Sequence, residues 1–486
     1  MPPGYQRRRP EESVLYQVLQ EHLETFLALA DESTSGGLPE FVVRELRGFL
    51  RCGILSYGFA RLHCATCNDD LLVPFSCRGR GFCPSCTGRT MADTAAHLVD
   101  RVIARVPVRQ WVLSLPYQLR YRLAYDSKLR TDVLAVFVRV VTSHYRREAK
   151  RRGLVDPRCG GVTSIQRAGS GLRLNLHYHT LMCDGVFTRA SEDAPPRFHA
   201  FDVSDADVAR VVATVRRRVL RLLERRGLLG EQDTAPPDAL QETEPLLAAC
   251  YSASVQGQIA TGERAGSWVR RQQDGHVRRA GLAEVKSELC ARAEGFDLHA
   301  RTRIPRHERG DLERLCRYVL RPPVATERLR WVDEKRTLMA LDLKRTWSDG
   351  TSSLIFTPLE LIEKLVPLIP LPMSNSVRYH GVFAPGSSWR SSVVAPLAKV
   401  PTDEYGEPLP EAEPCIRSRR LPWSRLLMRV IGVDVLTCTK CQGKRKIIAF
   451  IQDQAVAREI LEHLGLESTP PPITPARGPP QHELSL

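Results

Sequence analysis

The sequence predicts an α+β protein with a small metal-binding domain near its amino terminus. Stretches with apolar residues every three or four positions, typical of helices, alternate with shorter stretches typical of strands. Pairs of cysteines follow the first helical stretch. Because 486 residues with 43% hydrophobic content can form two or three cores, we expect a globular chain.

The chain is strongly basic, with a formal net charge of +15, and sixty of its 70 basic residues are arginines. Arginine contacts phosphate through paired hydrogen bonds, so the charge favours nucleic acid as a partner, with an anionic membrane surface second. A GC-rich genome would also raise the arginine content. The sequence has neither a signal peptide nor eighteen consecutive apolar residues, so we expect a cytoplasmic protein without a membrane partner.

The predicted elements follow one another in a clear order. Helices are expected at residues 14–30, 93–106, 128–150, 208–227, 310–323 and 358–369. Strands are expected at 109–116, which ends at a proline, at 160–169, at 172–187 and beside the cysteine pair within 435–451. The strands at 160–169 and 172–187 are separated only by a Gly-Ser turn, so we expect them to be neighbours.

This order predicts six segments. They are a helical segment (1–50), a zinc-binding domain (51–95), a catalytic domain (96–325), the carboxy-terminal part of the catalytic body (326–425), a segment with one cysteine pair (426–466) and a disordered proline-rich tail (467–486).

Two histidines one residue apart stand in the predicted strand Leu172–Phe187. Side chains alternate between the faces of a strand, so His177 and His179 share one face with Asn175, while the opposite face is apolar. Two imidazoles on one face can chelate a divalent cation. Gln166, just before the turn into this strand, is our candidate for a third ligand, and His299 competes with it.

The cysteine-rich stretch predicts a zinc site. Cys64 and Cys67 form one C-x-x-C pair and Cys83 and Cys86 form another, a spacing that can present four thiolates to one ion. Three further residues lie close enough in sequence to change this ligand set or to hold a second ion: Cys52, His63 and Cys77.

Two other features of the cysteine pattern have competing interpretations. Arg78 and Arg80 lie in an arginine-glycine loop between the pairs, where they suit either phosphate contact or a solvated turn. Cys438 and Cys441 form a pair without a second pair downstream, which fits either a degenerate zinc ribbon or reduced thiols on a turn.

A metal held by two histidines can polarise a phosphoryl oxygen, and DNA strand transfer also needs a protein nucleophile that holds the cut end. Tyr318 lies at the margin of the apolar stripe of the predicted helix 310–323, where a packing role is the simplest interpretation. Arg314, Arg317 and Arg321 surround it and could neutralise a phosphate.

Five motifs in order resemble the rolling-circle insertion-sequence transposases of the HUH class, specifically the IS91-like family. They are SCRGRGFCPSC (76–86), WVLSLPYQLRY (111–121), LNLHYHTLMCDGVF (174–187), LCRYVLRPP (315–323) and RYHGVFAP (378–385). The resemblance implies an HUH endonuclease fold, in which an antiparallel sheet is backed by helices and preceded by a zinc-binding domain.

The resemblance also implies site roles. His177 and His179 would hold Mg²⁺ or Mn²⁺, and Tyr318 would join the 5′ phosphate of cut single-stranded DNA. Element-end DNA would be the partner and Zn²⁺ the structural ion, while Arg317 and Arg321 would contact the DNA. The resemblance leaves open whether the chain forms a homo-oligomer. Founding members carry two tyrosines four residues apart, whereas the position four before Tyr318 is Arg314, so the chain resembles the single-tyrosine branch.

Two other functions fit the sequence. A regulator or decayed transposase would bind DNA through its zinc domain without forming a covalent adduct. A replication initiator or relaxase would share the chemistry but act at an origin instead of at element ends.

Overall fold

The computed structural model describes residues 5–33, 36–229, 238–273, 288–394, 422–431 and 433–478. Within these ranges the protein combines helices with antiparallel sheets, which confirms the predicted α+β class. None of the described helices is both long enough and apolar enough to cross a bilayer.

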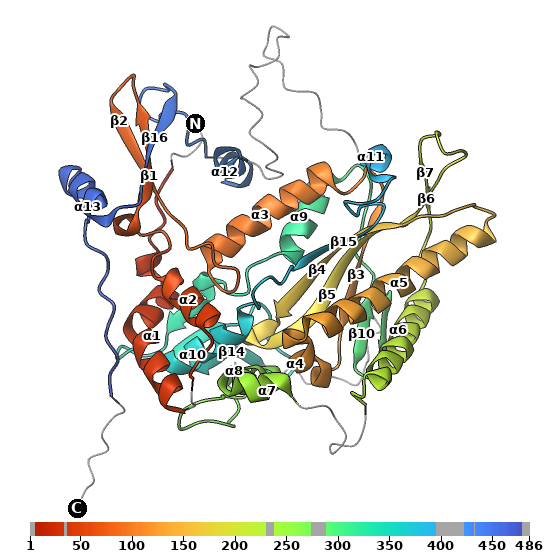
Figure 1. Cartoon of the computed structure of the whole chain (residues 1–486), viewed down its shortest axis with the longest axis horizontal. Coiled ribbons are helices and arrows are strands. Elements are labelled where there is room, and N and C mark those ends of the chain that lie inside the picture. The colour runs from red at the N-terminus through yellow and green to blue at the C-terminus, as the bar shows by residue number, and fades with distance from the viewer. Residues whose placement is uncertain are drawn as a thin grey trace, which may run out of the picture.

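A seven-stranded antiparallel sheet lies at the centre of the molecule (Figure 1). Its order is β15 (Val377–Gly381), β4 (Gly160–Ala168), β5 (Leu174–Cys183), β3 (Val108–Ser114), β10 (Phe296–His299) and β9 (Cys290–Ala293), and β11 (Arg303–Ile304) also pairs with β3. The predicted neighbours β4 and β5 pair directly, with Gln166 opposite His177. The histidine strand is therefore an inner strand of the sheet.

Helices cover both faces of this sheet (Figure 1). Leu176, Tyr178 and Met182 of β5 pack in one core with α5 (Ser127–Arg151) and α6 (Asp205–Arg225). Leu181 and Cys183 of the same strand pack in another core with α3 (Pro84–Arg101) and α9 (Arg309–Val319). The alternation along β5 thus places the histidines on the face covered by α3 and α9.

Further helices and a second sheet form the amino-terminal side of the molecule. The helices are α1 (Val14–Ser33), α2 (Glu40–Phe49), α4 (Tyr117–Tyr125), α7 (Ala239–Thr243), α8 (Pro245–Gln256) and α10 (Pro358–Leu365). The sheet has the order β12 (Leu329–Trp331), β13 (Met339–Asp342), β14 (Thr351–Phe356) and β8 (Arg270–Gln273). Residues of α1, α2, α8, α10 and this sheet share one large apolar core.

A three-stranded sheet joins distant parts of the chain. Its order is β16 (Arg445–Ile451), β1 (Phe59–Cys64) and β2 (Asp69–Pro74), with α13 (Gln454–His463) packed close by. The described structure is completed by the hairpin of β6 (Gly185–Thr188) and β7 (Arg197–Ala200) and by α11 (Arg390–Val393) and α12 (Trp423–Ile431). The sequence placed β1 and β16 in separate segments, 51–95 and 426–466, whereas the structure pairs them.

Two further expectations need correction. The helix expected from residue 93 begins earlier, at Pro84, because proline is well suited to the first turn of a helix. The tail expected to be disordered makes hydrogen bonds with α1 in its described part, since Thr474 donates from its backbone to the carbonyl of Gln20. Its last residues, 479–486, lie outside the described residues.

A buried carboxylate ties the far end of β5 to its neighbours. Asp184 is fully buried and accepts two hydrogen bonds from Arg109, at 2.8 and 2.9 Å. Its oxygens also accept from the hydroxyl of Tyr145 at 2.9 Å and from Arg303 at 2.7 Å. Because every partner lies on a different element, this carboxylate fixes β3, α5 and β11 against the histidine strand.

Replacing Asp184 with alanine would leave Arg109 buried without its counter-charge. We expect the free energy of unfolding to fall by about 3–5 kcal/mol, measured by denaturant titration. Glu148→Ala, which removes ion pairs to the exposed Arg151 and Arg152, is the matched control and should cost less than about 1 kcal/mol. Equal losses in the two variants would contradict a structural role for the Asp184 network.

Candidate functional site

The predicted metal-binding histidines lie side by side on β5. Their ring centroids are 4.9 Å apart, and His179 is only 5% exposed. Gln166 and Ser164 of β4 stand directly opposite His177 and His179 in the strand register. Since side chains directly opposite one another share a face, these four residues form one polar patch beneath α9.

Hydrogen bonds orient both rings. His177 Nδ1 lies 2.7 Å from the backbone oxygen of Asn175, and a carbonyl only accepts, so Nδ1 carries the proton and Nε2 keeps its lone pair. His179 Nδ1 lies 2.8 Å from the side-chain amide of Gln110. The facing atom is Gln110 Nε2, which donates, so in this arrangement neutral His179 carries its proton on Nε2. An amide turned by 180° would present its oxygen to Nδ1 and leave His179 Nε2 unprotonated.

The surroundings keep both imidazoles neutral. Burial lowers the pKa of His177, and burial together with the nearby His177 and Arg321 lowers the pKa of His179 to about 3. A lowered pKa means that the ring stays unprotonated at neutral pH. Neutral imidazole is the form that binds a metal ion, so the pair suits a divalent cation.

Gln166 connects the histidine patch to α9. Its Nε2 donates to the backbone oxygen of Val319 at 2.6 Å, and Ser164 Oγ donates to the same oxygen at 3.0 Å. Among the described residues no hydrogen bond involves Gln166 Oε1, and Gln166 stands opposite His177. The competing candidate, His299, contacts Cys290 Sγ at 2.8 Å and stands on β10, two strands from β5.

Tyr318 stands over this patch. Its ring centroid lies 6.2 Å from that of His179, and the two rings are perpendicular. The apolar stripe of α9 is buried, whereas Tyr318 at its margin is 45% exposed. The guanidinium of Arg321 lies 4.6 Å from the centre of the Tyr318 ring. A tyrosine so placed reaches solvent and the histidine patch at once.

A basic cleft of about 1150 Å³ opens at Tyr318. Basic side chains dominate its charged lining, and the acidic residue among them is Glu327. The basic residues are Arg8, Arg80, Arg130, Arg167, Arg321, Arg328, Lys344 and Arg345. Among the described residues, Arg8, Arg321, Lys344 and Arg345 form no ion pair, which leaves their charges free for an anionic ligand.

The structure separates the four predicted DNA-contacting arginines into two groups. Arg80 and Arg321 line the cleft. Arg78 lies outside its lining, and Arg317 is paired with Glu313 at 2.6 Å.

The cysteines form two clusters instead of the one predicted site. Cys52, Cys77, Cys83 and Cys86 make the first cysteine cluster. Cys64 and Cys67 belong with Cys438 and Cys441 in the second cysteine cluster. The expectation that the pairs Cys64/Cys67 and Cys83/Cys86 share one ion is therefore wrong. His63 joins neither cluster, because its Nδ1 lies 2.9 Å from Asp70.

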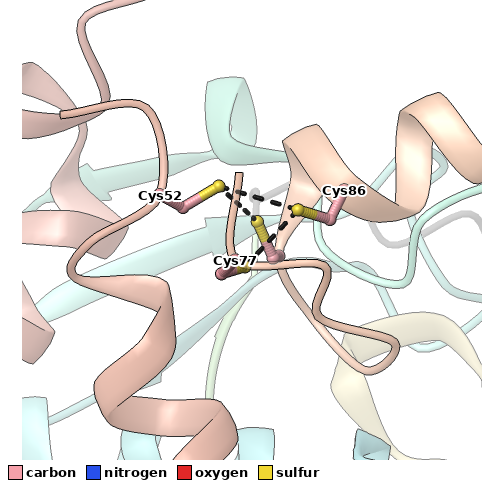
Figure 2. A group of neighbouring side chains, drawn as sticks. Cys52, Cys77 and Cys86 are labelled. Carbon is pink, nitrogen blue, oxygen red and sulfur yellow. Dashed lines mark hydrogen bonds between the residues drawn. The ribbon is translucent and has the colours of Figure 1, made fainter. Parts of the chain in front are cut away.

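The first cysteine cluster has the arrangement of a zinc site (Figure 2). The sulfur of Cys86 lies 3.6 Å from that of Cys52 and 3.4 Å from that of Cys77. Tetrahedral thiolates 2.3 Å from zinc would stand about 3.8 Å apart. The backbone N–H of Gly79 also points at Cys77 Sγ, 3.3 Å away, as a donor to a thiolate. These residues fit a structural zinc ion.

This cluster fastens the start of α3. Cys83 caps the helix and Cys86 lies in its first turn, while Cys52 follows α2. The local spacing predicted the Cys83/Cys86 pair. The pairing of Cys64 and Cys67 with cysteines more than 370 residues away had only one signal, namely a second pair at Cys438 and Cys441 without a local partner.

Two family models match the chain. Residues 160–391 match a model described as "Putative transposase", and residues 18–115 match one described as "Transposase zinc-binding domain". Neither a curated protein nor a solved structure matches. The two matches define a DNA strand-transfer protein that carries structural zinc. Together the two matches support an IS91-like transposase with an amino-terminal zinc-binding domain, a class of protein whose partner is DNA.

Replacing Cys86 with serine should release zinc from the first cysteine cluster and fray the first turn of α3. We expect the free energy of unfolding to fall by about 4 kcal/mol, because loss of a structural metal is among the most costly single changes. Hydrogen exchange of the α3 amides would locate the change. Cys290→Ser, outside both clusters, should leave those amides protected, and unchanged exchange in Cys86→Ser would refute the assignment.

Proposed function

We propose that the protein is the transposase of a rolling-circle insertion sequence and that it nicks and rejoins single-stranded DNA at element ends through Tyr318. One observation carries this proposal above the others. The Tyr318 ring, which lines the basic cleft, stands 6.2 Å from that of His179, so a nucleophile, a candidate metal-binding pair and an anion-binding surface lie next to one another.

His177 and His179 would hold Mg²⁺ or Mn²⁺ through their Nε2 atoms, with Gln166 Oε1 as the third ligand. For His179 this requires the Gln110 amide to turn and present its oxygen to Nδ1. The bound ion would polarise a phosphoryl oxygen and offset the charge that builds up on it. Gln166 is a better candidate for the third ligand than His299, because it lies opposite His177 and also hydrogen-bonds to the end of α9.

The strand transfer is a balanced exchange of phosphodiester bonds. The phenol oxygen of Tyr318 attacks the scissile phosphorus and its proton passes to solvent. A tyrosine–phosphorus bond forms as the bond to the 3′ oxygen breaks, and that oxygen takes up a proton to become the free 3′ hydroxyl. Rejoining reverses these steps, so no external energy source is needed.

Arg321 is placed to assist at the phosphate. Its guanidinium covers one side of the Tyr318 ring, which holds the phenol in position by a cation–π contact. The same charge lies in the cleft lining, where it can contact the DNA backbone.

The α9 helix offers one tyrosine at this place. Four residues before Tyr318 stands Arg314, paired with Asp311 on the exposed side of the helix. A second strand transfer would therefore use a tyrosine of another subunit, the same tyrosine again, or water.

The enzyme should form a covalent adduct with DNA. Purified protein incubated with Mn²⁺ and labelled single-stranded DNA from the element end should give a slower band on a denaturing gel. Tyr318→Phe should abolish the band by removing the nucleophile, and His177→Ala should reduce it at least about 100-fold by removing a metal ligand.

Tyr117→Phe is the matched control, because Tyr117 is also exposed but lies outside the cleft lining. It should form the adduct like the wild type. Intact DNA binding without any adduct in the wild type would favour the DNA-binding regulator over the enzyme.

Arg321→Ala should weaken binding of single-stranded DNA about tenfold, because it removes a cation from the cleft. The slope of log affinity against log salt should become shallower by about 0.7, the value for one phosphate contact on a single strand. Fluorescence anisotropy at several salt concentrations measures both quantities. Arg314→Ala, an arginine of α9 outside the cleft lining, should change neither, and equal effects would contradict the proposed DNA path.

A further inference from the structure

We propose that the chain holds two zinc ions and that the second fastens the carboxy-terminal segment 433–451 to the hairpin β1–β2. Its ligands are Cys64 at the end of β1, Cys67 in the turn before β2, and Cys438 and Cys441 just before β16. The site is thus assembled from two ends of the chain.

The sulfur positions match a shared ion. Cys64 Sγ lies 3.5 Å from Cys441 Sγ, and Cys67 Sγ lies 3.5 Å from Cys438 Sγ. Disulfide-bonded sulfurs would be about 2.05 Å apart, whereas sulfurs around a tetrahedral zinc would be about 3.8 Å apart. The backbone N–H of Gly443 lies 3.4 Å from Cys441 Sγ, as Gly79 does toward Cys77 in the first cluster.

Four thiolates bind either zinc or iron. Zinc is the ion that the wider context favours, because the match to the transposase zinc-binding domain spans residues 18–115 and so includes Cys64 and Cys67. That match ends long before Cys438. The matched zinc-binding domain therefore supplies two ligands of this site, Cys64 and Cys67, and Cys438 and Cys441 supply the other two.

The sheet β16–β1–β2 has a small apolar core, so a metal ion would add substantially to its stability. Its own apolar core contains four buried residues, Phe59, Leu72, Ala457 and Leu461. A core of this size supplies little stability, and small domains commonly depend on a metal for the rest. Polar contacts at the cluster point the same way, since Asp69 of β2 pairs with Lys440 and Arg445, both at 2.7 Å.

The helix that precedes the fastened segment contacts the helix that carries Tyr318. Arg429 of α12 bonds to Glu313 Oε2 of α9 at 2.7 Å and to Asp100 of α3. Glu313 lies on the helix that carries Tyr318. Zinc in the second cluster would thereby anchor the chain directly after α12, the helix whose Arg429 contacts α9.

Counting the metal on the purified full-length protein tests the proposal without reference to DNA cleavage. Mass spectrometry of metals should find two zinc ions per chain in the wild type. Cys441→Ser and Cys52→Ser should each retain one, and Cys290→Ser, whose thiol lies outside both clusters, should retain two. One zinc per wild-type chain, or iron in its place, would overturn the proposal.

Hydrogen exchange then assigns each ion to its cluster. Amides of β16 should lose protection in Cys441→Ser and keep it in Cys52→Ser. The opposite pattern, or no change in either, would refute the fastening role.

Alkylation of the wild type gives a test that does not depend on a variant's folding. Cys438 and Cys441 should resist iodoacetamide until a chelator is added. Equal modification before and after chelation would show that these thiols hold no metal.

Discussion

The backbone oxygen of Val319 is the point on which the arrangement of the site depends. It accepts hydrogen bonds from Ser164 and Gln166 of β4, so the end of α9 is fixed against the strand that lies beside the histidines. These bonds add to the apolar packing of α9 in positioning the Tyr318 ring over His179. The same glutamine has its second side-chain atom free beside His177. In the proposed mechanism, nucleophile and metal ligands are thus held by one set of side chains, which would give a phosphoryl-transfer site the fixed geometry it requires.

The elements that build this site were largely predictable because their signals are local. The alternation along β5 correctly placed both histidines on one face, and the double proline marks the end of α9 close to Tyr318. The role of Tyr318 was not predictable from its helix, because its position is equally typical of a packing residue. The family resemblance proposed that role, and the approach of α9 to β5, a tertiary contact, supports it. The choice between Gln166 and His299 as third ligand also depends on tertiary structure. Gln166 lies on β4, next to β5, whereas His299 lies on β10, two strands from β5.

The cysteines show where sequence reasoning fails. Spacing identifies pairs that can bind one ion together, but it cannot say which pairs meet. Cys83 and Cys86 cluster with Cys52 and Cys77, which lie nearby in sequence. Cys64 and Cys67 instead cluster with Cys438 and Cys441, near the other end of the sequence. That meeting follows from the pairing of β16 with β1, a long-range contact without a local signature. If the second cysteine cluster holds zinc as proposed, the zinc-binding part of the protein is larger than the continuous stretch that matches a zinc-binding domain.

The most direct test of the account is to identify the amino acid that carries the DNA. The wild-type protein would be reacted with single-stranded element-end DNA and Mn²⁺, digested with nuclease and protease, and its peptides sequenced by mass spectrometry. The account predicts a 5′-phosphorylated nucleotide on Tyr318. A nucleotide on any other residue, such as Tyr379 of β15, would contradict the assignment of the nucleophile and the role of the α9 contact with it.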